Sequence, residues 1–126
     1  MTTAAFIAVA LLALVGAFQV ALALGAPWGE AAWGGRNPGV LPGRIRVASA
    51  IAALLYPLLA LFVLASAGVV EASWRPGRGR VPMWILTGFF ALGAVANFAS
   101  RSPKERWWGP VSLAIAICCG LIAVGL

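Results

Sequence analysis

The sequence predicts an all-α membrane protein: a bundle of four transmembrane helices with a structured first loop. Two properties of the chain lead to this expectation. Of its 126 residues, 63% are hydrophobic and only 10% are charged, and the mean hydropathy is +1.00. A soluble domain is about 45–50% apolar and about 25% charged. Because so few charges cannot cover a water-facing surface, lipid is the expected solvent for most of the chain.

The apolar residues form four runs, and we expect a single domain over residues 1–126 in which each run is a helix. The expected helices are residues 4–26, 47–70, 81–99 and 108–126. Each is close to the roughly 20 residues that a helix needs to cross the hydrocarbon, and none alternates as barrel strands do. The first run exceeds the apolar core of a signal peptide, which has about 7–15 residues, so it is expected to remain as a helix.

Basic residues lie between the runs, and their distribution predicts an orientation. The first and third loops, on one side of the membrane, hold Arg36, Arg44, Arg46, Arg101, Lys104 and Arg106, against Arg75, Arg78 and Arg80 in the second loop. A basic excess marks cytoplasmic loops, so loops one and three are expected inside and both termini outside. The net charge of +6 indicates attraction to anionic lipid headgroups and not to nucleic acid. The Arg-, Ala- and Gly-rich composition favours a bacterial cell (inner) membrane as the location.

The first loop, "GAPWGEAAWGGRNPGVLPGRIR" over residues 25–46, concentrates turn-forming residues, indoles and charges. These features predict a structured cap, and whether it re-enters the membrane stays open. Glu30 is its one acid and is expected to pair with a basic residue on the same side. The candidates are Arg36, Arg44, Arg46 and Arg101. Glu105 stands between two basic residues of the third loop and is expected to be an ordinary solvated charge.

The tryptophans lie at the ends of the apolar runs. Amphipathic indole rings favour the headgroup level of a bilayer. The expected interfacial anchors are Trp28, Trp33, Trp74, Trp84, Trp107 and Trp108.

Polar residues inside the spans gather at one depth. At 1.5 Å per residue, they lie within about 10 Å of the end that carries loops one and three. The candidate polar cluster or ligand pocket consists of Gln19, Glu30, Ser49, Asn97 and Arg101. Hydrogen bonds between helices are the favoured interpretation, and a pocket capped by the first loop is the alternative.

Small residues recur every four positions in two of the runs, which predicts close helix packing. The stripes are Ala13, Ala17, Ala21 and Gly25 in the first run, and Ser112, Ala116 and Gly120 in the fourth. Cys118 and Cys119 are adjacent within an apolar run and are expected to be buried free thiols. Pro57 interrupts the second run, where a static kink is favoured over a hinge.

The residue types offer no catalytic, cofactor-binding or metal-binding pattern. The chain has no histidine, and no nucleophile–base pair, metal-ligand set or phosphate loop stands out. We therefore expect a protein that is not an enzyme and carries no cofactor. A small multidrug antiporter is excluded because the first run has no acidic residue, and a fluoride channel because its third- and fourth-helix motifs are missing.

Three motifs, "GAPWGEAAWGG", "LPGRIRVAS" and "NFASRSPKERWWGPV", follow one another along the chain. In this order they resemble a family of small uncharacterised bacterial four-helix integral membrane proteins. The resemblance implies a four-helix fold and no catalytic residues.

The expected function is that of an accessory or scaffold subunit, or of a binder of lipid or another apolar ligand. The alternative is a small oligomeric transporter or channel, with Gln19, Asn97 and Arg101 along a polar path. Membrane lipids are the expected partners, and a homo-oligomer or a larger membrane complex stays open.

Overall fold

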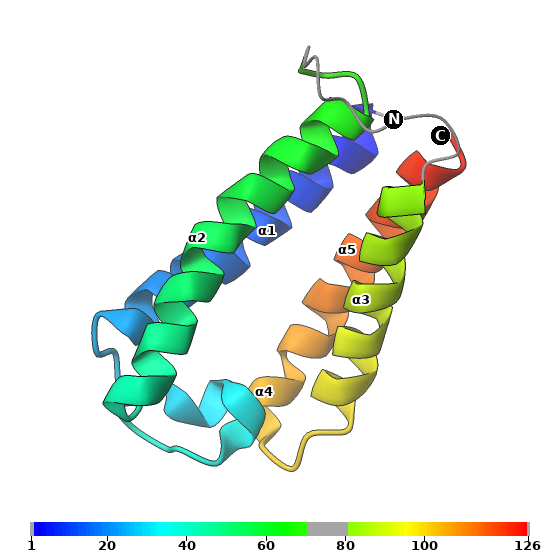
Figure 1. Cartoon of the computed structure of the whole chain (residues 1–126). Helices are drawn as coiled ribbons and strands as arrows, with labels where there is room; N and C mark the ends of the chain where they lie inside the picture. The colour runs from blue at the N-terminus through cyan, green and yellow to red at the C-terminus, as the bar shows by residue number, and fades with distance from the viewer. Residues whose placement is uncertain (1, 71–80, 126) are drawn as a thin grey trace.

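The computed structural model describes residues 2–70 and 81–125, and this part of the chain contains helices and no strands (Figure 1). The four long helices are α1 (Thr2–Ala23), α2 (Gly43–Ser66), α3 (Val81–Phe98) and α5 (Trp108–Ala123). Two 3-10 turns, η1 (Gly29–Ala31) and η2 (Trp33–Gly35), lie in the first loop, and the short helix α4 (Pro103–Arg106) precedes α5. Four segments are long and apolar enough to cross a membrane, α4 and α5 together forming the last. The predicted all-α four-helix fold is confirmed.

Helix α2 begins one turn before the predicted residue 47. The carbonyl oxygen of Pro42 accepts hydrogen bonds from the N–H groups of Ile45 and Arg46, both at 2.9 Å. The first turn of α2 therefore includes arginines that hydropathy assigns to the loop. The apolar run marks the part of the helix suited to hydrocarbon, and the helix itself extends beyond it.

Helix α1 ends three residues before the predicted residue 26. Gly25 has φ +104°, a left-handed conformation that glycine adopts without a steric penalty. The N–H of Ala26 then donates to the carbonyl of Ala21 at 2.9 Å, as in a Schellman C-cap. Helix α2 ends in the same way before Gly68, which has φ +78°.

The helices form two hairpins, α1 with α2 and α3 with α5, joined by a contact between α1 and α5. The order in space is therefore α2, α1, α5, α3. In Figure 1 the hairpins come together near the chain termini and diverge toward the other end, where the first loop and α4 lie between them.

The end near the termini has a dry core at which three or more helices meet. Its side chains are apolar, and most of them are fully buried: Ala5, Ala8, Leu12, Val63, Met83, Ile115, Cys119 and Ile122. Cys118 and Cys119 are both buried free thiols, as predicted. Helix packing in lipid depends on such close contact, because lipid chains are as apolar as the side chains they replace.

The small-residue stripe of the last helix is confirmed as a packing surface against α3. A Cβ added to Gly93 of α3 would lie 3.0 Å from the Ser112 hydroxyl oxygen. That hydroxyl donates a hydrogen bond to the Phe90 carbonyl at 2.7 Å.

The stripe predicted in the first helix is not used in this way. Ala13 and Ala17 are exposed. Helix α1 instead approaches α2 at Gly16, where an added Cβ would lie 3.3 Å from the Tyr56 Cβ. The regular spacing of alanines therefore reflects only the high alanine content of the helix. The close contact between α1 and α2 is made at Gly16.

Candidate ligand cavity

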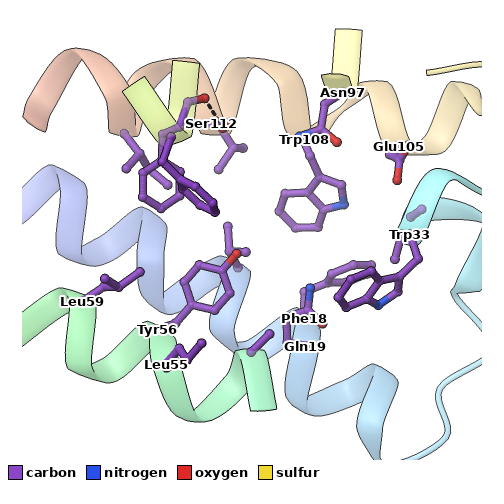
Figure 2. Close-up of a pocket in the computed structure, with 18 residues that line it drawn as sticks. Phe18, Gln19, Trp33, Leu55, Tyr56, Leu59, Asn97, Glu105, Trp108 and Ser112 are labelled. Atoms are coloured by element: carbon purple, nitrogen blue, oxygen red, sulfur yellow. Dashed lines mark hydrogen bonds between the residues drawn. The ribbon is translucent and has the colours of Figure 1, made fainter. Parts of the chain in front are cut away.

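A cavity of about 380 Å³ lies between the two hairpins, next to the first loop. Its walls are mainly apolar and aromatic (Figure 2). Leu55 of α2 and Phe89 of α3 both line it, yet they are 52% and 61% exposed. The cavity therefore reaches the outer surface on the side where α2 and α3 do not pack closely. In a bilayer this side faces lipid.

Aromatic side chains occupy the loop end of the space between the hairpins. The Phe18 and Trp108 rings lie 4.7 Å apart between centroids, and Trp28 stacks on the other side of Phe18 at 6.3 Å. In the first loop, Ala32 and Leu41 pack against Leu22 of α1. These side chains fill the loop end of the bundle. Phe18, Ala32 and Trp108 also form the part of the cavity wall nearest the loop.

Gln19 lies in the wall of this cavity, and its side-chain oxygen Oε1 is buried without a hydrogen-bond partner. Asn97 lines the same cavity. No hydrogen bond joins Gln19 to Asn97 among the described residues, so hydrogen bonding between helices does not account for this pair of side chains. An unpaired buried acceptor costs free energy, and the Gln19 oxygen is too enclosed to contact the cavity space.

Glu105 corrects the sequence interpretation most strongly. Its side chain belongs to α4, lines the cavity and is only 8% exposed as a residue. Its carboxylate oxygen Oε2 accepts the backbone N–H of Gly34 at 2.8 Å. Expecting a solvated charge here was wrong, because the first loop folds over this carboxylate. Within the described ranges, no lysine or arginine nitrogen lies within 4.0 Å of it.

Glu30 forms its ion pair with Lys104, with 3.4 Å between Oε2 and Nζ. The predicted pairing with a basic residue at the same end of the bundle is confirmed, and the predicted arginine partners are wrong, because α4 brings the lysine next to η1. The Ser102 hydroxyl also donates to the Glu30 carbonyl oxygen. Arg46, one of the expected partners, donates instead from Nε to the Ala23 carbonyl at 3.0 Å and caps the end of α1. Loops one and three are therefore joined, and the predicted structured cap is present.

The five candidate polar residues divide into three groups. Gln19 and Asn97 line the cavity. Ser49 is fully buried and accepts a hydrogen bond from the Trp33 indole nitrogen Nε1 at 2.9 Å. Glu30 and Arg101 are exposed and lie outside the cavity wall. Counting residues along the predicted helices thus identified part of the site. It missed Glu105, Tyr56 and the aromatic side chains of the cavity wall.

The tryptophans also differ in their surroundings. Trp33 and Trp108 line the cavity, so the expectation that they act only as interfacial anchors is incomplete. Trp33 has φ +51°, which is rare for a bulky residue, and its bond to Ser49 helps to hold it there. Trp28, Trp84 and Trp107 are 51%, 48% and 79% exposed, as an interfacial role requires. Trp74 lies outside the described residues.

This arrangement defines a small helical bundle with membrane-length helices and a cavity that reaches its lateral surface. In the part of the chain that the structure describes, no three His, Cys, Asp or Glu side chains are placed to hold a metal ion. Comparisons with known protein families, curated proteins and solved structures find no match for the chain. Membership of the family that the loop motifs resemble therefore stays a prediction.

Proposed function

We propose that the chain is a multi-pass protein of a bacterial cell membrane that binds a lipid or another apolar ligand in the cavity between its hairpins. One observation carries the proposal: an apolar cavity with Gln19 and Asn97 in its wall reaches the lateral surface between α2 and α3. A molecule dissolved in the bilayer would enter from the side and bury its apolar part in this cavity. A role as an accessory subunit would use this binding, and no enzyme activity is part of the proposal.

The alternative function, a small oligomeric transporter or channel, has less support. It relied on Gln19, Asn97 and Arg101 along one polar path. Arg101 is exposed and lies outside the cavity wall, and the cavity is mainly apolar. A polar ion path through hydrocarbon requires continuous polar or charged lining, which these residues do not form.

The orientation is also part of the proposal: the joined loops one and three, which carry most of the basic residues, face the cytoplasm. Single cysteines at Val40 and Gly77, in a chain with both native cysteines changed to alanine, would be tested in intact cells with a reagent that does not cross membranes. Labelling at Gly77→Cys alone is the expected result. Labelling at Val40→Cys alone would reverse the orientation.

Ligand binding is tested with a neutral photoreactive probe, a medium-chain alkanol with a diazirine in its chain. Ala52 of α2 lines the cavity, and Ala50 of the same helix is exposed. We expect Ala52→Phe to fill the cavity and reduce probe capture several-fold. Ala50→Phe is the matched control, because it adds the same ring to the same helix outside the cavity.

The cross-linked peptides should contain cavity-lining residues in the wild-type protein. Equal capture by the wild-type and Ala52→Phe proteins, with both folded, would refute the proposed binding site.

A further inference from the structure

Among the described residues, one charged side chain lies in the cavity wall, and it is the acid Glu105. From this we infer that the ligand is a single-chain amphiphile with a protonated amine as its head group. The ammonium lies beside Glu105, and the hydrocarbon chain extends between α2 and α3. The inference rests on the proposed function, because it names the chemical class that the same cavity binds.

Charge is the first argument. The Glu105 carboxylate is buried, and Gly34 N–H is its one hydrogen-bond donor among the described residues. A carboxylate removed from water is costly unless a cation or several donors compensate. The basic residues on either side of it in the sequence are engaged elsewhere: Lys104 pairs with Glu30, and Arg106 donates to the Ser100 carbonyl at 2.7 Å. A ligand cation would supply the missing charge.

The aromatic wall is the second argument. Figure 2 shows Trp108 and Glu105 on one side of the cavity, with Phe18 and Trp33 facing them. The faces of indole and phenyl rings attract cations, most strongly where water is excluded. A carboxylate among aromatic rings therefore favours an ammonium over a neutral hydroxyl and disfavours an anion.

The position of the polar groups along the bundle is the third argument. Glu105 and Asn97 lie near the loop end, whereas Leu59 and Phe89 lie farther along their helices toward the middle. A bilayer amphiphile keeps its head near the interface and its chain in the hydrocarbon, which is the same order.

The size of the cavity limits the ligand to one chain. Its volume of about 380 Å³ is near the lower end of the roughly 300–1,000 Å³ of pockets that hold drug-sized molecules. A phospholipid with two chains is too large, and its phosphate would lie close to the Glu105 carboxylate. An ethanolamine phospholipid therefore does not fit, although it carries an ammonium.

The test compares two diazirine probes of equal chain length, an alkylamine and an alkanol, in uncharged maltoside micelles. Glu105→Gln keeps an oxygen that can accept the Gly34 N–H while it removes the charge. We expect the wild-type protein to capture the amine at least about thirtyfold more than the alkanol, which is the scale of losing a charged partner in a desolvated site. Glu105→Gln should remove this preference and still capture the alkanol. The two probes partition differently into micelles, but this difference is the same for both proteins because both are measured in the same detergent. It therefore cancels when the preferences of the two proteins are compared.

Glu30→Gln is the matched control, since it removes an acid at the same end of the bundle but outside the cavity wall, and it should keep the preference. An equal preference for the amine in the wild-type and Glu105→Gln proteins would overturn the inference. The inference would also be overturned if the wild-type protein captured both probes equally. If alkanol capture then still depended on Ala52, the proposed function would stand. Loss of Ala52-dependent capture for both probes would refute the proposed function itself.

Phosphatidylethanolamine added to the micelles distinguishes a membrane phospholipid from a single-chain amine. It should leave capture of the alkylamine unchanged. Displacement of the probe by this lipid would overturn the single-chain assignment.

Discussion

The two ends of the bundle are held together by different interactions. Near the termini, small and branched side chains such as Ala5, Leu12 and Ile122 are almost completely buried between the helices. At the loop end, hydrogen bonds join segments far apart in the sequence, as between Gly34 and Glu105. Close packing brings the helices into direct contact. Hydrogen bonds between the loops instead connect hairpins that remain separated. The cavity lies next to the cross-linked end, where the hairpins are held apart, and it extends to Ile115 at the edge of the core.

The largest expected effect comes from breaking the cap at Gly29. A Cβ at this position would lie 1.8 Å from the Asn37 carbonyl oxygen, and the Gly29 N–H donates to Gly39 at 2.8 Å. Gly29→Ala should lower the free energy of unfolding by about 3 kcal/mol or more and expose the first loop to protease. Gly43→Ala is the control, because nothing lies within 4 Å of its added Cβ. Equal melting temperatures for the two variants in detergent would contradict this account of the cap.

A second prediction compares the two ends with the same substitution. Leu12 is 1% exposed in the dry core, while Leu59 lines the cavity. Leu12→Ala leaves a new void and should cost about 1–3 kcal/mol of unfolding free energy. Leu59→Ala enlarges a space that already exists and should cost less, by about 1 kcal/mol or more. Similar losses in detergent unfolding would show that the ends are packed alike.

A third prediction concerns the cross-link between the loops. Glu105→Ala removes the acceptor for the Gly34 N–H and should cost about 1–3 kcal/mol, because a part-buried donor is left unpaired. Glu105→Gln retains an acceptor and should cost less. The melting temperatures of the two variants, measured together with protease cleavage in the first loop, test this. A larger loss for Gln than for Ala would argue against the hydrogen bond as the cause.

The smallest effect is expected at the ion pair on the outside. The Glu30 and Lys104 side chains are 49% and 68% exposed, and such pairs contribute about 0–1 kcal/mol. Glu30→Gln should therefore change the melting temperature little, and the difference from wild type should shrink further at high salt. A loss as large as that of Glu105→Ala would show that the outer pair, and not the inner carboxylate, fastens the loops.

The helices were predictable from sequence because transfer into lipid depends on each segment's own composition. The hydrogen-bond partners at the loop end could not be predicted from sequence. Glu105 is buried by Gly34, a residue 71 positions away, and its immediate neighbours look like those of any solvated charge. Its burial depends on how the first loop folds, which no local pattern reports.

The candidate cavity was predictable in part for the same reason. Gln19 and Asn97 lie within regular helices, so counting residues along the helix axes was enough to group them, and both line the same cavity. Arg101 lies beyond the end of α3 at Phe98, where the chain turns and helical spacing no longer applies. Tyr56 was not among the predicted site residues, because its position opposite Gly16 depends on how α1 and α2 pair.

The order of the helices in space has a consequence for synthesis in the membrane. Each hairpin joins consecutive long helices, α1 with α2 and α3 with α5, so each can insert as soon as it leaves the ribosome. The contact between α1 and α5 unites the first and last helices, and it forms only when the whole chain is available. Contacts of such large sequence separation form slowly. In a bilayer, one face of α1 would stay uncovered by protein until α5 is inserted, and the cavity between the hairpins would be completed last.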